Sequence, residues 1–344
     1  MVALLEPVRP AAAPEVLARP VAVLLAVRFV TGLGRSLAVV VPVALVSTFV
    51  TYALGSFTNS NPAAAVLGDL ATPADIARLN HQFGLDRPLL AQYWNWITAA
   101  LHGDLGTSWF TTIPVSDSIK QTLPVDLSLT VLALLIALLL GGAAGIGAAL
   151  RSGGVFDRTV TALCAIASTV PAFVIGIGLI VVFAVLLPVL PSGGYAPLSE
   201  SPVQWLRFLI LPALALSLDL TADIARQLRN SLVGTLRENF VTGAEVRGLS
   251  RRRVLFRHAL RNAAGPTLTV LGYRVPQLIG GAVITETLFN LPGMGKLTLD
   301  AAAQQDIPVI QGTLLVTIAI VLLANVLVNG ALVRLRPQAA RRSA

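Results

Sequence analysis

Asp219, Asp223 and Arg226 are ionisable side chains within a long apolar stretch of the sequence. Spacings of four and three residues place them on one face if the stretch is helical. Inside a bilayer a carboxylate costs about 2.5–3.5 kcal/mol, so such groups face a cavity or a charged partner. Two interpretations follow from this. Either Arg226 neutralises Asp223 in a structural charge ladder, or Asp219 lines a path along which a cationic group passes.

A second concentration of charge consists of seven arginines between residues 237 and 261. Within it we expect a helix that ends at Arg247, because Gly248 can take the left-handed conformation that follows a helix. Ser250 is then placed to cap a second helix that begins at Arg251. The sequence therefore predicts a helix, a tight turn and a second helix. A basic surface helix that binds anionic lipid head groups is the alternative.

Other kinds of reactive site lack the necessary spacing. The three histidines and the single Cys164 have no metal-ligand spacing, so we expect no metal site. Gly295 and Lys296 do not form a phosphate-binding loop, because Leu297 stands where Ser or Thr is needed. We therefore expect this chain to bind no nucleotide. It also lacks any pairing of a nucleophile with a base, which argues against a membrane enzyme.

The elements that position these residues are apolar helices. Of the 344 residues, 55% are hydrophobic and 12% are charged, about half the charged share of a soluble domain. A helix needs about 20 apolar residues to cross a bilayer. We expect six membrane spans, within residues 36–68, 127–150, 159–199, 208–228, 263–285 and 307–333.

The arginines also predict the orientation of the chain. Lys and Arg near span ends stay in the cytosol during insertion, and most of the arginines fall on one side if both termini are cytosolic. That topology places segment 57–122 outside and segment 237–262 in the cytosol. The net charge of +8 then reflects topology and contact with membrane lipid, and we expect no nucleic-acid partner.

The outer segment 57–122 is expected to fold as a helical cap. Thr72 followed by Pro73 and Asp75 is a helix start, and Gly84 can end that helix. A second helix is expected over residues 88–101. This cap lies between the first and second spans.

Segment 237–262 resembles the "EAA" loop of bacterial ABC-importer permeases. The resemblance rests on a cluster of small residues, an obligate glycine and a short tail ten residues further on: Thr242, Gly243, Ala244, Gly248 and His258 to Asn262. The sequence departs from the pattern where Glu-Ala-Ala would stand and where proline often replaces Arg261. Those departures are typical of the dipeptide, oligopeptide and nickel permeases of the DppB/OppB type.

Further matches to that family lie outside the loop. They are residues 84–88, 92–93, 96, 103–106 and 108 in the cap, and residues 286–296 and 306–312 near the last two spans. Together the matches extend over residues 35–336. The weakest point is residues 54–64, where only Pro62 remains of the family's usual turn.

The resemblance implies an all-α integral membrane protein with the six-helix fold of a type I ABC importer permease. The charged and proline-containing residues before the first apolar run predict a cytosolic N-terminal tail at 1–34 with an interfacial helix from about Val21. The resemblance covers the permease domain at 35–336, and a cytosolic tail is expected at 337–344. In the family the loop is a coupling helix that docks on the ATPase. The residues that would carry this role here are Thr242, Ala244, Glu245, Gly248, Leu249, Ser250, Arg251, His258 and Asn262.

The same resemblance implies the partners and the function. The chain would form half of a pathway for peptides or a related small solute in the bacterial plasma membrane. A second homologous permease, two ATPase subunits or one fused ATPase, and an extracytoplasmic substrate-binding protein would complete the importer. ATP and Mg²⁺ would be bound by the ATPase partners, so the chain itself would be neither an enzyme nor a cofactor carrier. Candidates for the translocation path are Asp219, Asp223 and Glu286.

A second function remains open at this point. An ion-coupled secondary transporter would use the same three carboxylates as proton or sodium sites. Such a transporter would work without partner subunits. This hypothesis gives no reason for the glycine turn in the arginine-rich loop.

Overall fold

The fold is entirely helical over the residues that the computed structural model describes, 21–56 and 61–335. One isolated bridge joins Thr107 and Pro114, outside any sheet. The helices are α1 Val21–Ser56, α2 Pro62–Leu67, α3 Pro73–Phe83, α4 Leu89–Leu101, α5 Val115–Leu150, α6 Val155–Ala167, α7 Ala172–Ile180, η1 Val181–Leu186, α8 Pro202–Leu236, α9 Asn239–Val246, α10 Arg251–Arg253, η2 Val254–Ala259, α11 Leu260–Leu288, α12 Met294–Gln304 and α13 Ile307–Leu335.

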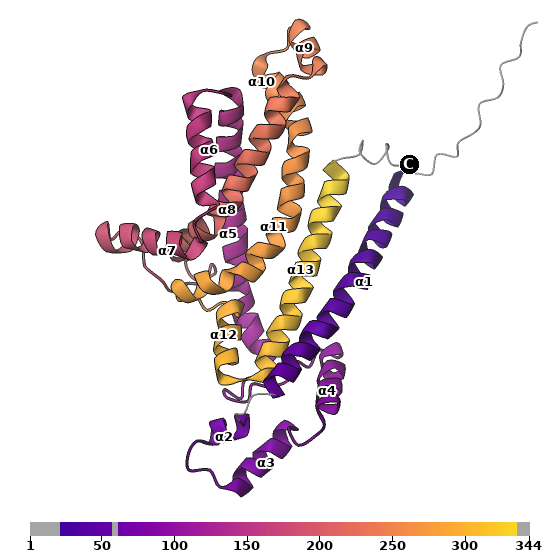
Figure 1. Cartoon of the computed structure of the whole chain (residues 1–344), viewed down its shortest axis with the longest axis vertical. Coiled ribbons are helices and arrows are strands. Elements are labelled where there is room, and N and C mark those ends of the chain that lie inside the picture. Colours follow the sequence, from indigo (N-terminus) through magenta and orange to yellow (C-terminus); the bar gives the residue numbers. More distant parts are fainter. Residues whose placement is uncertain (1–20, 57–60, 336–344) are drawn as a thin grey trace, which may run out of the picture.

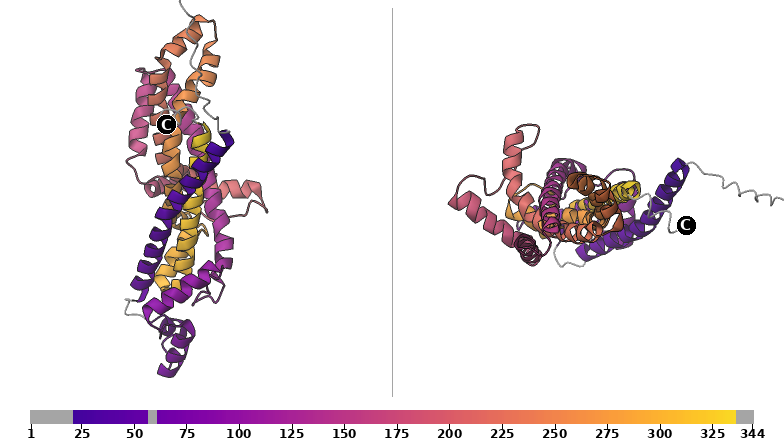
Figure 2. Two further views of the ribbon diagram at one scale, coloured as in Figure 1. Left: turned by 90° about the vertical axis from the view of Figure 1, so that its right-hand side faces the viewer. Right: turned by 90° about the horizontal axis from the view of Figure 1, so that it is seen from above.

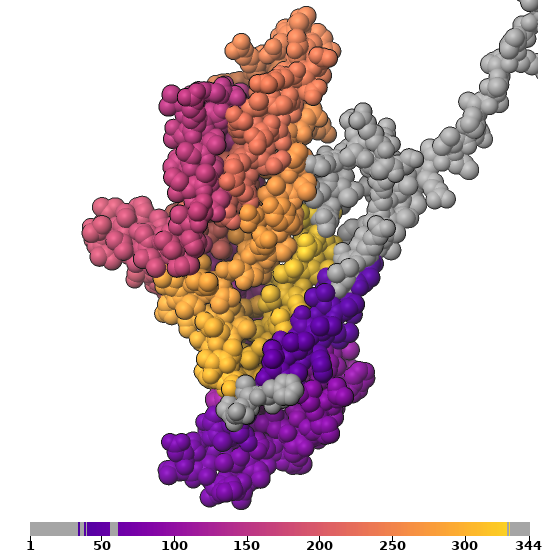
Figure 3. Space-filling model, in the orientation of Figure 1, coloured from indigo at the N-terminus to yellow at the C-terminus, as the bar shows by residue number. Residues whose placement is uncertain are grey.

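The long helices form an elongated bundle with a small helical unit at each end (Figure 1). Helices α2, α3 and α4 lie at one end, and α9 and α10 lie at the other. Helix α8 packs against α5 and α11, and α13 packs against α1 and α11. The space-filling view shows the same elongated shape, with the α2–α4 unit closing one end (Figure 3). The predicted cap and the predicted arginine-rich loop therefore lie at opposite ends of the bundle.

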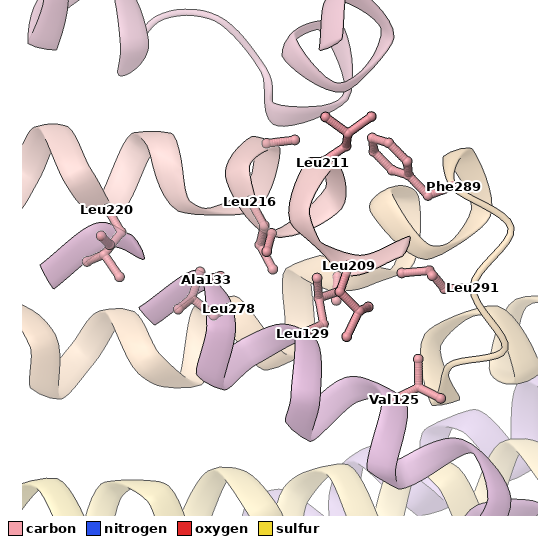
Figure 4. Close-up of a cluster of buried hydrophobic side chains, with 14 of the residues drawn as sticks. Val125, Leu129, Ala133, Leu209, Leu211, Leu216, Leu220, Leu278, Phe289 and Leu291 are labelled. Atoms are coloured by element: carbon pink, nitrogen blue, oxygen red, sulfur yellow. The ribbon is translucent and has the colours of Figure 1, made fainter. Parts of the chain in front are cut away.

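The main hydrophobic core lies where α5, α8 and α11 meet (Figure 4). Leu129 of α5, Leu209 and Leu220 of α8 and Leu278 of α11 are all buried in it. The loop after α11 closes one side of this core with Phe289, which is fully buried. These contacts fix α8 against α11, the two helices that flank the arginine-rich loop.

Three of the described helices are long and apolar enough to cross a membrane: α5, α8 and the Ile307–Val328 part of α13. A fourth crossing is formed if α6 and the α7–η1 segment count as one span. These helices support an integral membrane protein. Six spans and the cytosolic position of both termini remain predictions.

The third predicted span, over residues 159–199, is not a straight helix. Helix α6 ends at Ala167, and α7 starts at Ala172 after a bend of 102°. Pro171 explains the break, since proline has no backbone N–H to donate and disfavours helical geometry in the residue before it. The α6–α7 region projects from one side of the bundle, opposite α1 (Figure 2).

Helices α5 and α8 approach each other closely at Gly141 and Gly145. A Cβ atom at Gly141 would lie 2.7 Å from the carbonyl oxygen of Thr221, and one at Gly145 would lie 2.8 Å from that of Ala225. Two glycines four residues apart let helix backbones come together in this way. The pair therefore serves packing within the chain.

The ends of the chain differ in part from expectation. Helix α1 begins at Val21 and continues without a break to Ser56, so the structure shows no boundary at residue 34. Helix α2 is separate from α1, although the first predicted span, residues 36–68, covers α2 and the second half of α1. The expected tails at residues 1–20 and 337–344 lie outside the described residues.

Candidate functional site

The arginine-rich loop folds as a helix, a glycine turn and a second helix. Helix α9 is followed by Gly248, whose φ of 79° lies in the left-handed region. The N–H of Gly248 donates to the carbonyl of Glu245 at 2.9 Å, and the N–H of Leu249 donates to that of Ala244 at 3.2 Å. These bonds satisfy carbonyls that a helix end leaves free. The predicted glycine turn is confirmed.

Ser250 stands at the start of the second helix, as predicted. Its backbone is extended (φ −62°, ψ 144°), and its carbonyl accepts a hydrogen bond from the N–H of Val254 at 3.0 Å. The Ser250 hydroxyl makes no capping bond, so the predicted side-chain cap is wrong. The second helix is longer than expected, because α10 passes through the π-helical segment η2 directly into α11.

A small apolar cluster holds the two arms of the loop together. Val241 and Ala244 of α9 are buried against Val254 of η2, and Leu236 and Leu249 pack around them. Among the residues of the predicted coupling role, only Ala244 is buried, whereas Leu249 and His258 are half-buried. The others are exposed: Thr242, Glu245, Gly248, Ser250, Arg251 and Asn262. The loop is therefore folded on an internal apolar contact while most of its polar side chains remain free.

The outer face of the loop also carries exposed apolar side chains. Val246 is 83% exposed and Phe256 is 60% exposed. Exposed apolar side chains beside arginines are typical of a surface that a protein partner covers. Asn262 lies at the base of the second arm, where its amide donates to the carbonyl of His258 at 3.0 Å.

A charge ladder connects α8 and α11. Arg226 donates to Asp223 at 2.6 Å, as the sequence predicted. Arg274 of α11 donates from Nε to Asp223 at 2.7 Å, and its Nη1 lies 2.9 Å from the Asp219 carboxylate. Four charges of alternating sign thus form one neutral row. Within the described residues, the predicted path candidates Asp219 and Asp223 are both paired.

Arg274 is the ladder residue for which the sequence analysis predicted no ion-pair partner. It lies 51 residues from Asp223 along the chain, and no short-range pattern connects the two. A usable signal exists, because an arginine within an apolar span needs a carboxylate on a neighbouring helix. Arg226 also reaches α6 and its end, donating to the Ser168 hydroxyl at 2.9 Å.

The exposed face of α11 is unusually polar for a helix in an apolar bundle. Its exposed positions between 262 and 281 recur every three or four residues and are mostly polar or small: Asn262, Pro266, Thr269, Tyr273, Gln277, Gly280 and Gly281. The exposed face of α5 is apolar instead, with Leu127, Val131 and Leu135. We call the α11 set the polar stripe. Side chains of this kind face water or protein partners rather than lipid.

A second ion pair fixes α6 to α8 close to the arginine-rich loop. Arg229 of α8 donates two hydrogen bonds to Asp157 of α6, at 3.0 and 2.6 Å. Asp157 is buried, and it also accepts the N–H of Gly153 at 2.8 Å. This bidentate contact between a guanidinium and a carboxylate is stronger and more directional than a single hydrogen bond. The end of α8 that leads into the loop is therefore held in place.

Glu286 is separate from the ladder. It lies twelve residues after Arg274 on α11, about 18 Å along the helix at 1.5 Å per residue, and its side chain is fully buried. Its carboxylate accepts the N–H of Lys296 at 2.8 Å, while buried Asp126 of α5 accepts the N–H of Met294 at 2.7 Å. The two acids hold the turn between α11 and α12. These contacts favour a structural role for Glu286 over one in an open path.

The cap contains both predicted helices, whereas α5 already begins at Val115, inside the predicted cap segment 57–122. Thr72 caps α3 and accepts the N–H of Asp75, and Gly84 ends that helix in the left-handed conformation. The hydrogen bond from the Thr72 hydroxyl lowers the pKa of Asp75 below its usual range. Helix α4 follows Pro88 and ends at Leu101.

Buried Asp306, just before α13, anchors the loop that leads from the cap into α5. The Ser108 hydroxyl donates to one Asp306 oxygen at 2.5 Å, and the N–H of Trp109 donates to the other at 3.2 Å. Sequence reasoning did not single out this contact, because its partners lie 198 residues apart.

Replacing Asp306 by alanine is expected to loosen the cap. Removing the acceptor leaves two buried donors unpaired, each at a cost of about 1–3 kcal/mol. Limited proteolysis of the purified protein should then cleave within residues 61–114 several times faster than in the unmodified chain. Asp300→Ala is the matched control, because Asp300 is exposed and pairs only with Lys296 at the surface. Equal cleavage rates in the two variants would contradict this anchoring role.

No metal site is evident in the part of the chain that the structure describes. No group of three or more His, Cys, Asp or Glu side chains there is arranged to hold an ion. The main polar features of the described residues are the ion pairs, the arginine-rich loop and the polar stripe.

These features define a helical integral membrane protein whose ends carry a compact cap and a basic loop. The chain belongs to the family of binding-protein-dependent transport system inner membrane components, whose model matches residues 141–341. The N-terminal model of the same transport systems matches residues 26–130. The predicted resemblance to ABC-importer permeases is confirmed.

Individual relatives extend over nearly the whole chain. The "Probable peptide ABC transporter permease protein y4tP" of Sinorhizobium fredii is 38% identical over 89% of this chain and 97% of its own length. The di/tripeptide transport system permease protein DppB of Pseudomonas aeruginosa is 35% identical over 86% of this chain and 95% of its own. The dipeptide transport system permease protein DppB of Escherichia coli is 32% identical over 86% of this chain and 94% of its own length. All three relatives are named as permease proteins.

Proposed function

We propose that the chain is the permease subunit of an ATP-driven importer and forms half of a translocation pathway for short peptides. The observation that carries this proposal is the match, along almost their full length, to relatives named as peptide permeases. The glycine turn supports it independently, since a basic helix that only bound lipid would not need two arms folded on each other. Solutes related to peptides fall within the same proposal.

The arginine-rich loop is the proposed contact with the ATPase subunits. Its exposed face combines arginines with Val246 and Phe256, and its fold is held by the buried cluster around Ala244. The loop connects α8 with α11, and the ladder ties these helices together through Arg274. A push on the loop would therefore move both helices as one unit. ATP and Mg²⁺ belong to the partner subunits in this proposal.

The polar stripe is the proposed pathway wall. One chain leaves the stripe uncovered, and a second, homologous permease facing it would enclose a polar channel. The uncovered stripe supports a facing partner, which we propose to be a related permease in a pseudo-twofold heterodimer, served by two ATPase subunits or one fused ATPase. Both termini would lie in the cytosol of a bacterial cell, with the loop on that side of the plasma membrane.

The cap is the proposed contact for the extracytoplasmic substrate-binding protein. It presents Leu70, Leu90 and Trp94 with exposures of 98%, 68% and 67%. A cleft of about 310 Å³ also opens between α3, α4 and the adjoining ends of α1 and α13, with Trp96 and Trp109 in its wall. Aromatic side chains of this kind are enriched where proteins meet.

The ladder also weighs against an ion-coupled secondary transporter. Proton or sodium sites need carboxylates that gain and lose their counter-ion. Asp223 already binds two arginines, and Glu286 is fully buried beneath a turn. Only Asp219 is substantially open, with 44% of its side chain exposed.

The proposal is tested by purifying the tagged chain from its host membrane together with the products of neighbouring genes. We expect a complex that contains a second permease and ATPase subunits, with an ATPase rate that rises when peptide-loaded binding protein is added. An active complex without a second permease would contradict the heterodimer. Peptide uptake by the purified chain alone, without ATP, would instead establish the secondary transporter.

A further inference from the structure

The Asp219–Arg274 pair occupies the middle of the proposed pathway wall. Asp219 is near the midpoint of α8, and Arg274 is near the midpoint of α11. Each lies about 20–25 Å from the ends of its helix at 1.5 Å per residue. Arg274 is followed one turn later by Gln277 of the polar stripe, to which it donates a hydrogen bond at 3.1 Å. The pair therefore opens on the stripe at about half the bundle's depth.

The four ladder charges are not held equally. Asp223 accepts from both Arg226 and Arg274 and has only 13% of its side chain exposed. Asp219 is 44% exposed, and Arg274 is its ion-pair partner. Arg274 uses Nε and Nη2 on Asp223, and it reaches Asp219 with Nη1. If Asp219 moves away, Arg274 is still held by Asp223 and Gln277, and one N–H of its Nη1 becomes available to a solute.

We propose that this pair is a binding station for zwitterionic solutes, in which Asp219 takes the ammonium group and Arg274 takes the carboxylate. The proposal rests on the permease function and adds a site in the path itself. A zwitterion replaces one internal ion pair by two, and the charge of the site stays zero throughout. A solute that lacks one of its charges would leave Asp219 or Arg274 without a partner, which is costly away from bulk water.

A role in solute binding also explains why an ion pair is present at this position and why it is half-exposed instead of buried. A buried pair of this kind could be replaced by apolar residues with little loss of stability. A half-exposed pair on a polar face keeps two opposite charges within reach of a passing molecule. It would bind weakly, because its own ion pair competes with the solute. Weak binding suits a site from which the solute must also leave.

The test is a protection experiment on the assembled membrane complex in lipid nanodiscs, without the binding protein. Gly281 is replaced by cysteine, because it lies on the polar stripe one turn from Gln277 and a Cβ there meets open space. A charged maleimide labels this cysteine, and the mass of the chain reports the rate. The probes are alanyl-alanine, its N-acetyl derivative and its C-terminal amide, each at millimolar concentration.

We expect alanyl-alanine to slow labelling, and the two single-charge derivatives to protect at least about tenfold less well. That factor matches the loss of one hydrogen bond to a charged group. Asp219→Asn should abolish the protection. Lys296→Gln, which changes a charge outside the stripe, should leave protection intact.

Three results would overturn the binding station: equal protection by all three probes, full protection in Asp219→Asn, or no protection by alanyl-alanine. A different result bears on the permease function. If the maleimide never labels Gly281→Cys in the complex, the polar stripe does not line a water-filled path, and the proposed pathway fails with it.

Discussion

Replacing Gly248 by valine is expected to stop ATP-driven transport while the chain still folds and inserts. The φ of 79° at Gly248 costs an ordinary residue about 1–2 kcal/mol, and a β-branched residue suffers most. No atom lies within 4 Å of a Cβ built there, so the penalty comes from the backbone alone. The turn would relax and tilt the two arms apart. Binding of the ATPase subunits should weaken by a factor of about 5–30, measured by their recovery with the purified permease.

Two variants separate this effect from a general loss of stability. Gly234→Val places the same side chain in the last turns of α8, also in open space but with helical backbone angles. It should transport normally. Gly248→Asn should keep part of the activity, since asparagine tolerates the left-handed region better than valine. Normal transport by Gly248→Val with its ATPase subunits attached would remove the main structural support for the coupling loop.

Replacing Gly145 by alanine is expected to destabilise the whole bundle. The added methyl group would lie 2.8 Å from the carbonyl oxygen of Ala225 and 3.2 Å from the Cβ of Leu228, so α5 and α8 must separate. Overpacking of this kind costs about 1–3 kcal/mol. The melting temperature of the purified protein in detergent should fall by roughly 2–10 °C.

Gly142→Ala is the matched control for this experiment. It lies on the same helix, and nothing is within 4 Å of its added Cβ. Alanine favours a helix over glycine by about 1 kcal/mol, so this variant should be as stable as the unmodified chain or slightly more stable. If both variants melted alike, the close approach of α5 and α8 would not contribute to stability.

Features set by neighbouring residues could be predicted from the sequence. Thr72 and Gly84 bound α3, and Gly248 forms its turn, because caps and left-handed glycines depend on a few adjacent residues. Arg226 and Asp223 form the expected pair because they lie three residues apart on one helix.

Features that depend on residues far apart in the sequence could not be predicted in this way. The ladder depends on Arg274, and the cap anchor depends on Asp306, each of which meets a partner far away in the sequence. Pro171 predicts that the helix within residues 159–199 breaks, because proline is a local signal. The direction and size of the bend between α6 and α7 could not be predicted, because hydrophobic periodicity does not reveal where an apolar run turns.

The second arm of the arginine-rich loop has no break before it becomes α11. Residues 251–288 therefore form one continuous helical stretch of roughly 55 Å along its path at 1.5 Å per residue, with Pro266 and Pro276 inside it. One end lies beside the ATPase in the proposed importer, the middle carries Arg274, and Glu286 near the far end is fastened to the turn at Lys296. In the proposed importer, this continuous helix would transmit a movement of the loop to its far end. A tilt of about 5° about its middle would move each tip by roughly 2–3 Å over that length, enough to narrow one mouth of a peptide-sized channel while widening the other.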